Sequence, residues 1–345
     1  MRALQLIGWG KDAEFRDVAE PEPGPGEVLV RVGGAGACHS DLHLMHDFTE
    51  GMLPWSPPFT LGHENAGWVE AVGAGVHDLE LGVPVVVYGP WGCGRCLRCR
   101  EGMENYCERQ ATIGAAGGGL GWDGGMAPLL RVPSARHVVP LTSLSPVDAA
   151  PLTDAGLTPY HAIKRSLALL GPGSFAVVIG AGGLGHMATQ ILDVCTPTTV
   201  IAVDPRREAL ALVSTVGAAH TVIAGADTAA ELRELTRGRG ADLVLDLVGS
   251  DETLAIGAAV TRQLGHVTLV GLAGGTLPVS FFSPQYEVSV ASTYWGSLPE
   301  LMEVVALAEA GKIRAHVQQF SLEDAPRAYE AMRDGSLRGR AVIVP

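Results

Sequence analysis

The sequence predicts an α/β protein in which a β-rich domain is followed by a doubly wound parallel-sheet domain. Three observations support this fold class. The first 150 residues carry short apolar runs between Gly and Pro, which is typical of strands in a sandwich or barrel. From about Pro151 onward, apolar runs alternate with stretches at helical spacing, which is typical of a parallel sheet covered on both faces. The pattern of the last fifty residues changes again, and we expect them to return to the first domain. The expected ranges are 1–153, 154–292 and 293–345.

The strands of the β-rich domain are expected at three apolar runs, which are Glu27–Val32, Gly67–Val72 and Val83–Tyr88. Gly24-Pro-Gly26 and Pro57-Pro58 lie between or before them and favour turns over continued strands.

The α/β domain is expected to open with a strand, a glycine-rich turn and a helix that ends near Val194. The expected strands of this domain are Ser174–Ile179, Thr199–Val203, Asp242–Asp246, His266–Val270 and Ser289–Ser292. A second helix is expected at Arg206–Val216. In the C-terminal segment, Pro299–Gly311 has the pattern of an amphipathic helix and Arg340–Val344 that of a closing strand.

Composition and charge exclude several classes of protein. The 345 residues are 47% apolar, which is too much for a disordered chain, and 24 basic against 37 acidic residues give a net charge of −13. A basic surface for nucleic acid is therefore not expected. Lys11 follows the short apolar start, which argues against a signal peptide, and the most apolar stretch, Ser174–Leu192, is too rich in Gly for a membrane span. We expect a cytoplasmic protein without membrane or nucleic-acid partners.

A glycine motif, Gly180-Ala-Gly182-Gly-Leu-Gly185, has the spacing G-x-G-x-x-G between an expected strand and an expected helix. In that context the glycines permit a tight turn, close approach of a pyrophosphate and packing of helix on strand. Asp204 ends the next strand, where a carboxylate accepts hydrogen bonds from the adenosine ribose and disfavours a 2′-phosphate. The motif predicts binding of NAD in preference to NADP, although Arg206 stands where an arginine can hold the extra phosphate. The alternative is a glycine turn with a structural role alone.

Four of the six cysteines lie within fifteen residues, and they are Cys93, Cys96, Cys99 and Cys107. Such clustering in a long chain favours a metal over disulfides. Four thiolates at this spacing can surround one tetrahedral zinc ion and leave no open position, which indicates a structural site. Arg95, Arg98 and Arg100 are expected to lower the pKa values of the thiols. An iron–sulfur cluster fits less well because the Pro expected after the last Cys is absent.

A second polar cluster is dispersed along the β-rich domain, in Cys38-His-Ser-Asp-Leu-His43 and Gly62-His63-Glu64. A catalytic zinc needs three protein ligands and one open position. Cys38 and His63 can supply two of the ligands. Residue chemistry leaves the third open among Glu64, His39, His43 and any carboxylate nearby in the fold. Taken singly, a cysteine such as Cys38 or a histidine such as His63 is more often a buried packing residue than a metal ligand.

Several motifs together give the chain a family resemblance. The segment Gly62-His-Glu-x2-Gly67-x5-Gly73-x2-Val76 is similar to the zinc signature of the medium-chain alcohol dehydrogenases. The cysteine spacing, the glycine loop and the ribose acid then follow in the order of that family, so the resemblance covers nearly the whole chain. The segments 152–161, 294–296 and 339–345 resemble the bacterial secondary alcohol dehydrogenases that act on ketones. The resemblance implies a GroES-like catalytic domain and a Rossmann domain.

The resemblance also implies roles for individual residues. The catalytic zinc ligands it implies are Cys38, His63 and Asp154, with an aspartate where many members have a second Cys. Glu64 matches a carboxylate behind the metal, and Asp41 matches the acid that orients the ligand histidine. Ser40 matches the hydroxyl beside the alcohol, and His43 matches the end of a proton relay. The implied cofactor residues are His39, Thr158, Gly180, Gly182, Leu184, Gly185, Asp204 and Arg206.

The substrate pocket implied by the resemblance is a mostly apolar cleft between the domains. Its candidate residues are Trp55, Leu120, Leu272, Tyr294 and Trp295, each of which is equally compatible with core packing.

The function implied is interconversion of alcohols, secondary alcohols among them, with ketones or aldehydes by hydride transfer to and from NAD. Two zinc ions per chain are implied, one catalytic and one structural. The alternatives are a polyol dehydrogenase of the same fold and a zinc-stabilised NAD-binding protein without turnover. A homo-oligomer, dimer or tetramer, is expected, with the strand near Ser289–Ser292 as a pairing edge.

Overall fold

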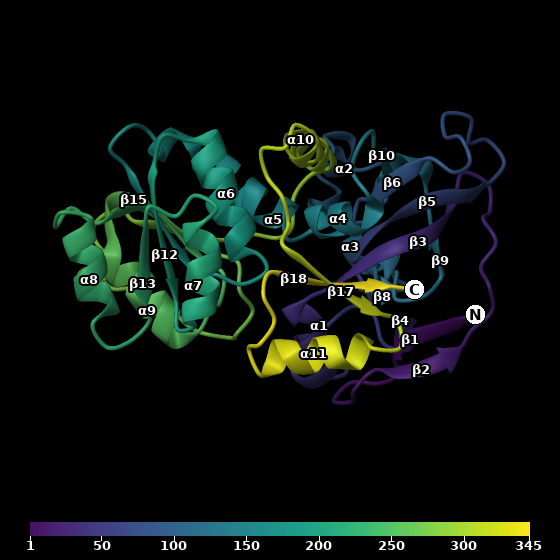
Figure 1. Cartoon of the computed structure of the whole chain (residues 1–345), viewed down its shortest axis with the longest axis horizontal. Helices are drawn as coiled ribbons and strands as arrows, with labels where there is room; N and C mark the ends of the chain where they lie inside the picture. Colours follow the sequence, from purple (N-terminus) through teal and green to yellow (C-terminus); the bar gives the residue numbers. More distant parts are fainter. The chain divides into compact units, whose positions relative to one another are not determined.

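A computed structural model describes all 345 residues, which fold into two compact units (Figure 1). Unit 1 comprises Met1–Leu157 and Gly296–Pro345, and unit 2 comprises Thr158–Trp295. Unit 1 is rich in strands and unit 2 contains a parallel sheet between helices, so the expected α/β class is confirmed. Asp154 belongs to unit 1 by this division.

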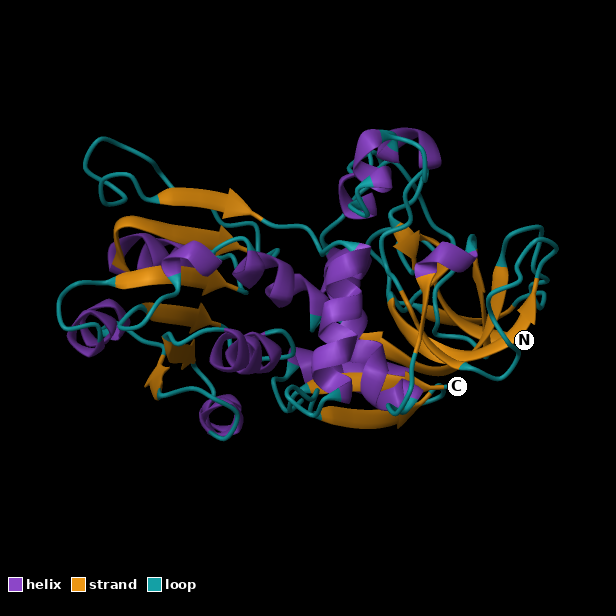
Figure 2. Cartoon of the chain, turned by 90° about the horizontal axis from the view of Figure 1, so that it is seen from above, coloured by secondary structure: helices purple, strands orange, loops and turns teal.

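The largest sheet of unit 1 has the strand order β10-β6-β5-β3-β18-β17, with β9 paired to one end of β3. Its strands are β3 (Val28–Ala37), β5 (Glu64–Val72), β6 (Pro84–Val87), β9 (Leu129–Val132), β10 (Val138–Pro140), β17 (Val317–Ser321) and β18 (Arg340–Val344). In Figure 2 these strands, in orange, curve around a common interior. The final strand, β18, therefore lies beside β3 from the start of the chain.

The register of this sheet brings three distant segments to one end of it. Gly36 pairs with Glu64 across antiparallel β3 and β5, and Ala37 pairs with Ala341 across β3 and β18. Cys38 follows β3 and His63 precedes β5, so both lie at the same end of the sheet as Arg340. Position 36 must be glycine here, because a Cβ atom would lie 1.8 Å from Oε2 of Glu64.

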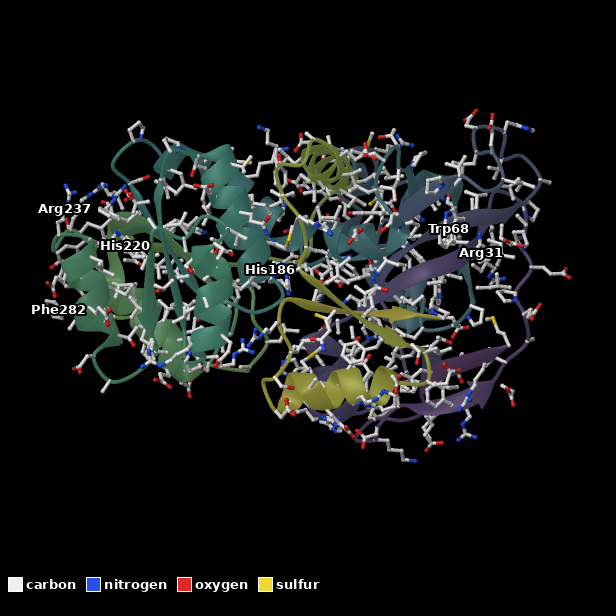
Figure 3. All side chains as sticks on the ribbon, viewed as in Figure 1. Arg31, Trp68, His186, His220, Arg237 and Phe282 are labelled. Atoms are coloured by element: carbon white, nitrogen blue, oxygen red, sulfur yellow. The ribbon has the colours of Figure 1, made fainter.

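The interior of unit 1 is a continuous apolar core that contains the inward faces of β1, β3, β5 and β6 together with Phe59, Met126 and Tyr329. On the opposite face, the guanidinium of Arg31 lies 4.4 Å from the ring of Trp68 on the neighbouring strand (Figure 3).

Smaller elements complete unit 1. The remaining strands are β1 (Arg2–Leu6), β2 (Glu14–Asp17) and β4 (Phe59–Thr60), which form one sheet, and β7 (Gly117–Gly118) and β8 (Gly121–Trp122), which form another. The helices are α1 (His39–His46), α2 (Leu97–Arg100), α3 (Gln110–Ile113), α4 (Pro146–Ala149), α10 (Leu298–Glu309) and α11 (Ala325–Arg333), with short 3-10 helices η1 (Glu104–Tyr106), η2 (Ala135–His137) and η3 (Ala150–Thr153). No helix of the chain has the length and apolar character needed to cross a bilayer.

Unit 2 is built on a six-stranded sheet in which every neighbouring pair is parallel. Its strands are β11 (Phe175–Ile179), β12 (Thr199–Asp204), β13 (His220–Ile223), β14 (Ala241–Asp246), β15 (Thr261–Leu269) and β16 (Ser289–Ser292). The order β13-β12-β11-β14-β15-β16 is the doubly wound order 3-2-1-4-5-6, which reverses direction between β11 and β14. Its helices are α5 (Leu157–Lys164, beginning at the junction), α6 (Gly185–Cys195), α7 (Arg207–Ser214), α8 (Thr228–Leu235) and α9 (Asp251–Val260), with the 3-10 helix η4 (Leu167–Leu169).

One strand of unit 2 was not expected from the sequence. In β13 only Val222 is buried, so His220–Ile223 lacks the apolar run that marks the other strands. The strand forms because its backbone pairs with β12 at the edge of the sheet.

Candidate active site and metal centres

Cys38, His63 and Asp154 converge at the end of β3 and β5 in unit 1. The Sγ atom of Cys38 lies 3.8 Å from Oδ2 of Asp154, and Nε2 of His63 lies 3.5 Å from the same oxygen. All three ligand atoms lie within 4.8 Å of one another. Cys38 and His63 are buried, whereas the side chain of Asp154 keeps 14% of its surface exposed. The three residues therefore form a ligand set with one side open to solvent.

The donor set fits a catalytic zinc ion. Tetrahedral zinc with bonds of about 2.0–2.3 Å places its ligand atoms about 3.5 Å apart, close to the separations found here. Burial opposes a charged imidazole at His63, but the carboxylates of Asp41 and Asp154 raise the pKa of His63 well above its ordinary value. The surroundings of Nε2 therefore favour a positive charge. A metal site with two anionic ligands, here Cys38 and Asp154, requires such surroundings.

Asp41 contacts His63 through Nδ1, the ring nitrogen other than the one beside Asp154. Its Oδ1 lies 3.2 Å from Nδ1 of His63, which leaves Nε2 facing Cys38 and Asp154. Its Oδ2 accepts hydrogen bonds from the N–H of Cys38 at 3.0 Å and from the hydroxyl of Tyr329 at 2.9 Å. A carboxylate behind a ligand histidine fixes the ring and its tautomer. Tyr329, on α11, is a part of this support that the sequence did not reveal.

Glu64 lies outside the set of three ligand atoms. Its carboxylate accepts two hydrogen bonds from Arg340, at 2.8 and 2.7 Å, and one from the N–H of Ala155 at 2.8 Å. Burial raises the pKa of Glu64, and the charge of Arg340 opposes that shift. Arg340 also lies 3.6 Å from Oδ2 of Asp154. The sequence marked Arg340 only as the start of a strand, because its partner is 276 residues away.

Helix α1 carries the remaining polar candidates of this site. Ser40 lies with its hydroxyl 3.3 Å from Nε2 of His63. His43 stands one turn later, contacts the exposed Asp47 through Nδ1, and has its ring 5.2 Å from that of His39. His39 is exposed at the start of the helix. The arrangement places a hydroxyl beside the ligand set and an imidazole–carboxylate pair toward solvent.

The four clustered cysteines form a compact lobe in unit 1. Sγ atoms lie 3.4 Å apart for Cys96 and Cys99, 3.9 Å for Cys93 and Cys99, and 4.0 Å for Cys96 and Cys107. Tetrahedral zinc with four bonds of about 2.3 Å separates its sulfurs by about 3.8 Å, so the lobe fits such an ion. No disulfide joins them.

Backbone N–H groups, more than arginine side chains, prepare the lobe for thiolates. N–H groups of Arg95 and Cys96 lower the pKa of Cys93 to about 6, and that of Cys99 lowers the pKa of Cys96. Burial raises the pKa values of Cys99 and Cys107, so a cation is needed to hold all four as thiolates. The arginine side chains, which were expected to lower the pKa values of the thiols, are not the leading cause of these shifts. Arg98 pairs instead with Glu101 at 2.9 Å.

The glycine loop connects β11 to α6 in unit 2 as the motif requires. Gly180 has a φ of +96°, which favours glycine, and a Cβ at Gly185 would lie 2.0 Å from the carbonyl oxygen of Gly180. At Gly182 a Cβ would meet only the guanidinium of Arg206, at 3.5 Å, so the backbone there can be approached closely. The glycine loop therefore fits the pyrophosphate of a dinucleotide at the start of α6. The buried residues of α6 include His186 (Figure 3).

Asp204 lies at the end of β12, beside the glycine loop. Its Oδ2 accepts a hydrogen bond from the N–H of Ala181 at 2.8 Å. Its Oδ1 accepts from the N–H and the Nε of Arg206 at 2.9 and 3.0 Å, and this contact raises the pKa of Arg206. A ribose hydroxyl bound by Asp204 must therefore share the carboxylate with Arg206 or displace it.

The other predicted cofactor and substrate residues are distributed over the two units. In unit 1, Trp55 and Leu120 are half-buried beside the apolar core. In unit 2, Thr158 and Trp295 are buried, Leu184 is half-buried, and Leu272 and Tyr294 are exposed. Trp295 has a φ of +54°, an uncommon value for a residue other than glycine. A role in substrate binding stays a prediction for all five pocket residues.

Comparison with known families now decides the family of this chain. Residues 24–143 match the alcohol dehydrogenase GroES-like domain, and residues 183–310 match the zinc-binding dehydrogenase domain. The chain belongs to the zinc-binding alcohol dehydrogenases. The resemblance inferred from the sequence motifs is therefore confirmed, as are the GroES-like and Rossmann-type domains.

Relatives within the zinc-binding alcohol dehydrogenases match over full length. An NAD-dependent alcohol dehydrogenase of Sulfurisphaera tokodaii is 37% identical, with both chains covered completely. A D-arabinose 1-dehydrogenase (NADP(+)) of Saccharolobus solfataricus is 35% identical, covering 100% of this chain and 97% of the relative. The crystal structure of an alcohol dehydrogenase from Aeropyrum pernix aligns with a TM-score of 0.93 at 39% identity and covers both chains completely.

Proposed function

We propose that this protein is a zinc- and NAD-dependent dehydrogenase that interconverts alcohols, secondary alcohols among them, with ketones or aldehydes. The observation that carries the proposal is the ligand set of Cys38, His63 and Asp154, which has an open side in a chain that also holds a dinucleotide-type glycine loop. Relatives named NAD-dependent alcohol dehydrogenases support the choice of cofactor and reaction.

Cys38, His63 and Asp154 would hold the catalytic zinc ion. When bound, zinc with an open position supplies Lewis acidity toward an alcohol or carbonyl oxygen. When bound, NAD supplies the acceptor or donor of the hydride. The protein supplies position and charge around both groups.

Ser40 is proposed to hydrogen-bond the substrate oxygen, because its hydroxyl lies 3.3 Å from a ligand nitrogen of His63. The proton that an alcohol gives up would leave through Ser40 and pass to His43. His43 contacts Asp47 through Nδ1, and the exposure of Asp47 opens a path to water. Asp41 keeps His63 turned toward the metal throughout.

Assays of oxidation and reduction test the reaction class. NADH oxidation is measured with ketones and aldehydes, and NAD reduction with secondary alcohols, primary alcohols, polyols and D-arabinose. We expect turnover of ketones and secondary alcohols, abolished in Cys38→Ser and retained in the control Cys195→Ser. Absence of turnover with every substrate, with NADH bound, would instead support an NAD-binding protein without catalysis.

A second candidate is a sugar or polyol dehydrogenase, favoured by the relative named D-arabinose 1-dehydrogenase. Turnover of polyols or D-arabinose in the same assay, without turnover of simple ketones, would establish this alternative.

The metal content proposed is two zinc ions per chain, one in the open ligand set and one in the cysteine lobe. Metal analysis of the purified protein should give two zinc ions per chain in the parent and one in Cys38→Ser. One in the parent would contradict the count. Reduced thiols in the lobe also favour a reducing compartment, so a cytoplasmic location remains our expectation.

We also propose a homo-oligomer formed through unit 2. The edge strand β16 is largely exposed, and exposed apolar side chains stand on the segment before it and on the paired strand β15: Phe281, Phe282, Tyr286 and Leu264. Phe282, 84% exposed, is marked in Figure 3. Exposed apolar groups together with an unpaired edge are typical of an interface, here with a second copy of the chain. Light scattering should give a dimer or tetramer, and Val290→Lys should shift it toward the monomer.

A further inference from the structure

Glu104 is a buried carboxylate inside the cysteine lobe that no proposed catalytic step uses. It lies in η1, with 3% of its surface exposed, between the third and fourth cysteines. Buried carboxylates are costly unless several donors face them. The surroundings of Glu104 therefore indicate what this group does.

Glu104 holds both ends of the cysteine loop. Its Oε2 accepts a hydrogen bond from the N–H of Gly92 at 2.6 Å, directly before Cys93. Its backbone carbonyl accepts from the N–H of Cys107, the last cysteine, at 3.0 Å. A single residue thus links the segments that carry the first and the last thiol.

The same carboxylate connects the lobe to η2. Oε1 accepts from Nε of Arg136 at 2.8 Å, and Oε2 accepts from its Nη2 at 3.2 Å and contacts Nε2 of His137 at 3.0 Å. Nη2 of Arg136 also donates to the carbonyl of Gly92 at 2.9 Å. Although burial acts in the opposite direction, the hydrogen bonds from His137 and Arg136 lower the pKa of Glu104 to about 2. The two carboxylate oxygens of Glu104 therefore face a guanidinium, an imidazole and a backbone N–H.

Packing around Gly92 shows how closely the carboxylate and the thiols meet. A Cβ atom at position 92 would lie 2.7 Å from Sγ of Cys99 and 3.0 Å from Oε2 of Glu104. No side chain fits between them, so the position of Glu104 determines the path of the chain into Cys93.

We propose that Glu104, braced by Arg136 and His137, is the positioning residue that sets how tightly the cysteine lobe retains its metal. This inference rests on the proposed zinc in the lobe. The loop from Gly92 to Cys107 has few apolar residues, so its shape depends on hydrogen bonds and on the ion. Partners behind metal ligands change metal affinity by about 10- to 100-fold when removed.

The central test compares Glu104→Gln with the matched control Glu101→Gln. Glu101 belongs to the same lobe, but its carboxylate pairs with Arg98 in an exposed ion pair. In Glu104→Gln the side-chain NH2 group must face N–H donors. The hydrogen bonds from Gly92, Arg136 and His137 therefore cannot all form, although the side chain keeps nearly the same shape. Both changes are made in the Cys38→Ser chain, which leaves the lobe as the zinc site measured.

Release of zinc to a coloured chelator is followed below the melting temperature of each variant. We expect Glu104→Gln to release its zinc about 10- to 100-fold faster than the Cys38→Ser parent, with Glu101→Gln unchanged. Cobalt(II) loaded into the lobe should show altered thiolate-to-metal absorption in Glu104→Gln alone, a signature that a purely structural loss of stability would not produce.

Three results decide the matter. Equal release rates and spectra for Glu104→Gln and Glu101→Gln would overturn the inference and leave the proposed function intact. A Cys38→Ser parent without zinc would overturn both the lobe zinc and this inference. If Glu104→Gln does not fold, Arg136→Gln decides, because the side chain of Arg136 is 41% exposed. It should release zinc faster than the parent, and an unchanged rate would overturn the inference.

Discussion

The guanidinium of Arg340 donates two hydrogen bonds to the carboxylate of Glu64, from Nε to Oε2 at 2.8 Å and from Nη2 to Oε1 at 2.7 Å. Both side chains are buried, with 5% and 0% of their surfaces exposed. The pair joins the final strand β18 to β5, directly beside the ligand His63. Glu64 can approach the three candidate ligands only if this double contact opens, so we expect Arg340 to govern whether Glu64 can serve as an exchanging ligand.

Removing Arg340 should destabilise unit 1 strongly. Arg340→Leu leaves Glu64 buried without its cation, and breaking a buried pair costs about 3–5 kcal/mol. Denaturant unfolding measures the loss. Arg314→Leu is the control, because the ion pair of Arg314 with Asp148 is exposed and should contribute at most about 1 kcal/mol. Equal losses in the two variants would contradict the importance of the buried pair.

Glu309 should stabilise unit 1 in a pH-dependent manner. At the end of α10, its carboxylate accepts hydrogen bonds from the N–H and hydroxyl of Thr142, at 2.5 and 2.6 Å, and from the N–H of Ser143. Burial acts in the opposite direction, but these bonds lower the pKa of Glu309. Glu309→Gln should cost about 1 kcal/mol at neutral pH.

The sign of the pH dependence follows from the lowered pKa. The contribution of Glu309 is complete above the ordinary pKa of a glutamate and disappears as the pH falls through the lowered pKa of the folded state. The free energies of unfolding of the parent and Glu309→Gln should therefore become equal in acid. Above about pH 5 they should differ by a constant amount. The exposed Glu323→Gln should follow the parent throughout, and a difference independent of pH would contradict the role of the charge.

Cofactor choice should depend on Asp204 and Arg206 in opposite ways. We expect a higher kcat/KM with NAD than with NADP, because Asp204 repels a 2′-phosphate. Asp204→Ala should lower the ratio of kcat/KM with NAD to kcat/KM with NADP. Each 1.4 kcal/mol of lost discrimination between the cofactors lowers this ratio about tenfold. Arg206→Ala frees the carboxylate of Asp204 for the ribose and removes the cation beside it, so the difference should widen. Equal kcat/KM for the two cofactors in the parent would refute the preference.

The sequence predicted those features that depend on local spacing. The glycine loop, the four-cysteine lobe and most strands of unit 2 could be located because each is encoded within a short segment. The edge strand β13 was missed because pairing with β12, rather than an apolar run, forms it.

Partners that are far apart in the chain could not be predicted from the residues alone. Arg340 meets Glu64, and Tyr329 meets Asp41, across more than 270 residues. The register of β3 with β5 and β18 creates the first of these contacts, and the packing of α11 creates the second. Spacing within the sequence contains no signal for either contact. Once the sheet order is known, Arg340 at the start of β18 can be recognised as a candidate partner for a carboxylate on a strand nearby in the sheet.

The cysteine lobe should stabilise the protein through its metal. Cys99→Ser removes a buried ligand, so zinc content should fall by one per chain and the melting temperature by several degrees. Cys195→Ser, at the exposed end of α6, should match the parent in both respects. A variant at Cys99 that melts like the parent and retains all its zinc would show that the lobe has another role.

Asp154 should complete the catalytic zinc site, and its replacement is the most direct test of the proposed function. Its Oδ2 lies within 3.8 Å of both Cys38 Sγ and His63 Nε2, whereas Glu64 is held by Arg340. Asp154→Asn removes one of two anionic ligands, so we expect loss of the catalytic zinc and a fall in kcat of at least about 100-fold.

The variants at position 154 should also separate metal binding from cofactor binding. NADH should still bind to Asp154→Asn, measured by its fluorescence, because the glycine loop lies in the other unit. Asp154→Cys supplies a thiolate in place of the carboxylate and should retain the metal. The exposed Asp78→Asn serves as the control, with parent zinc and parent kcat. A crystal structure in which zinc is bound by Cys38, His63 and Glu64, with Asp154 turned to solvent, would refute the assignment, since Arg340 would then have released Glu64 to the metal.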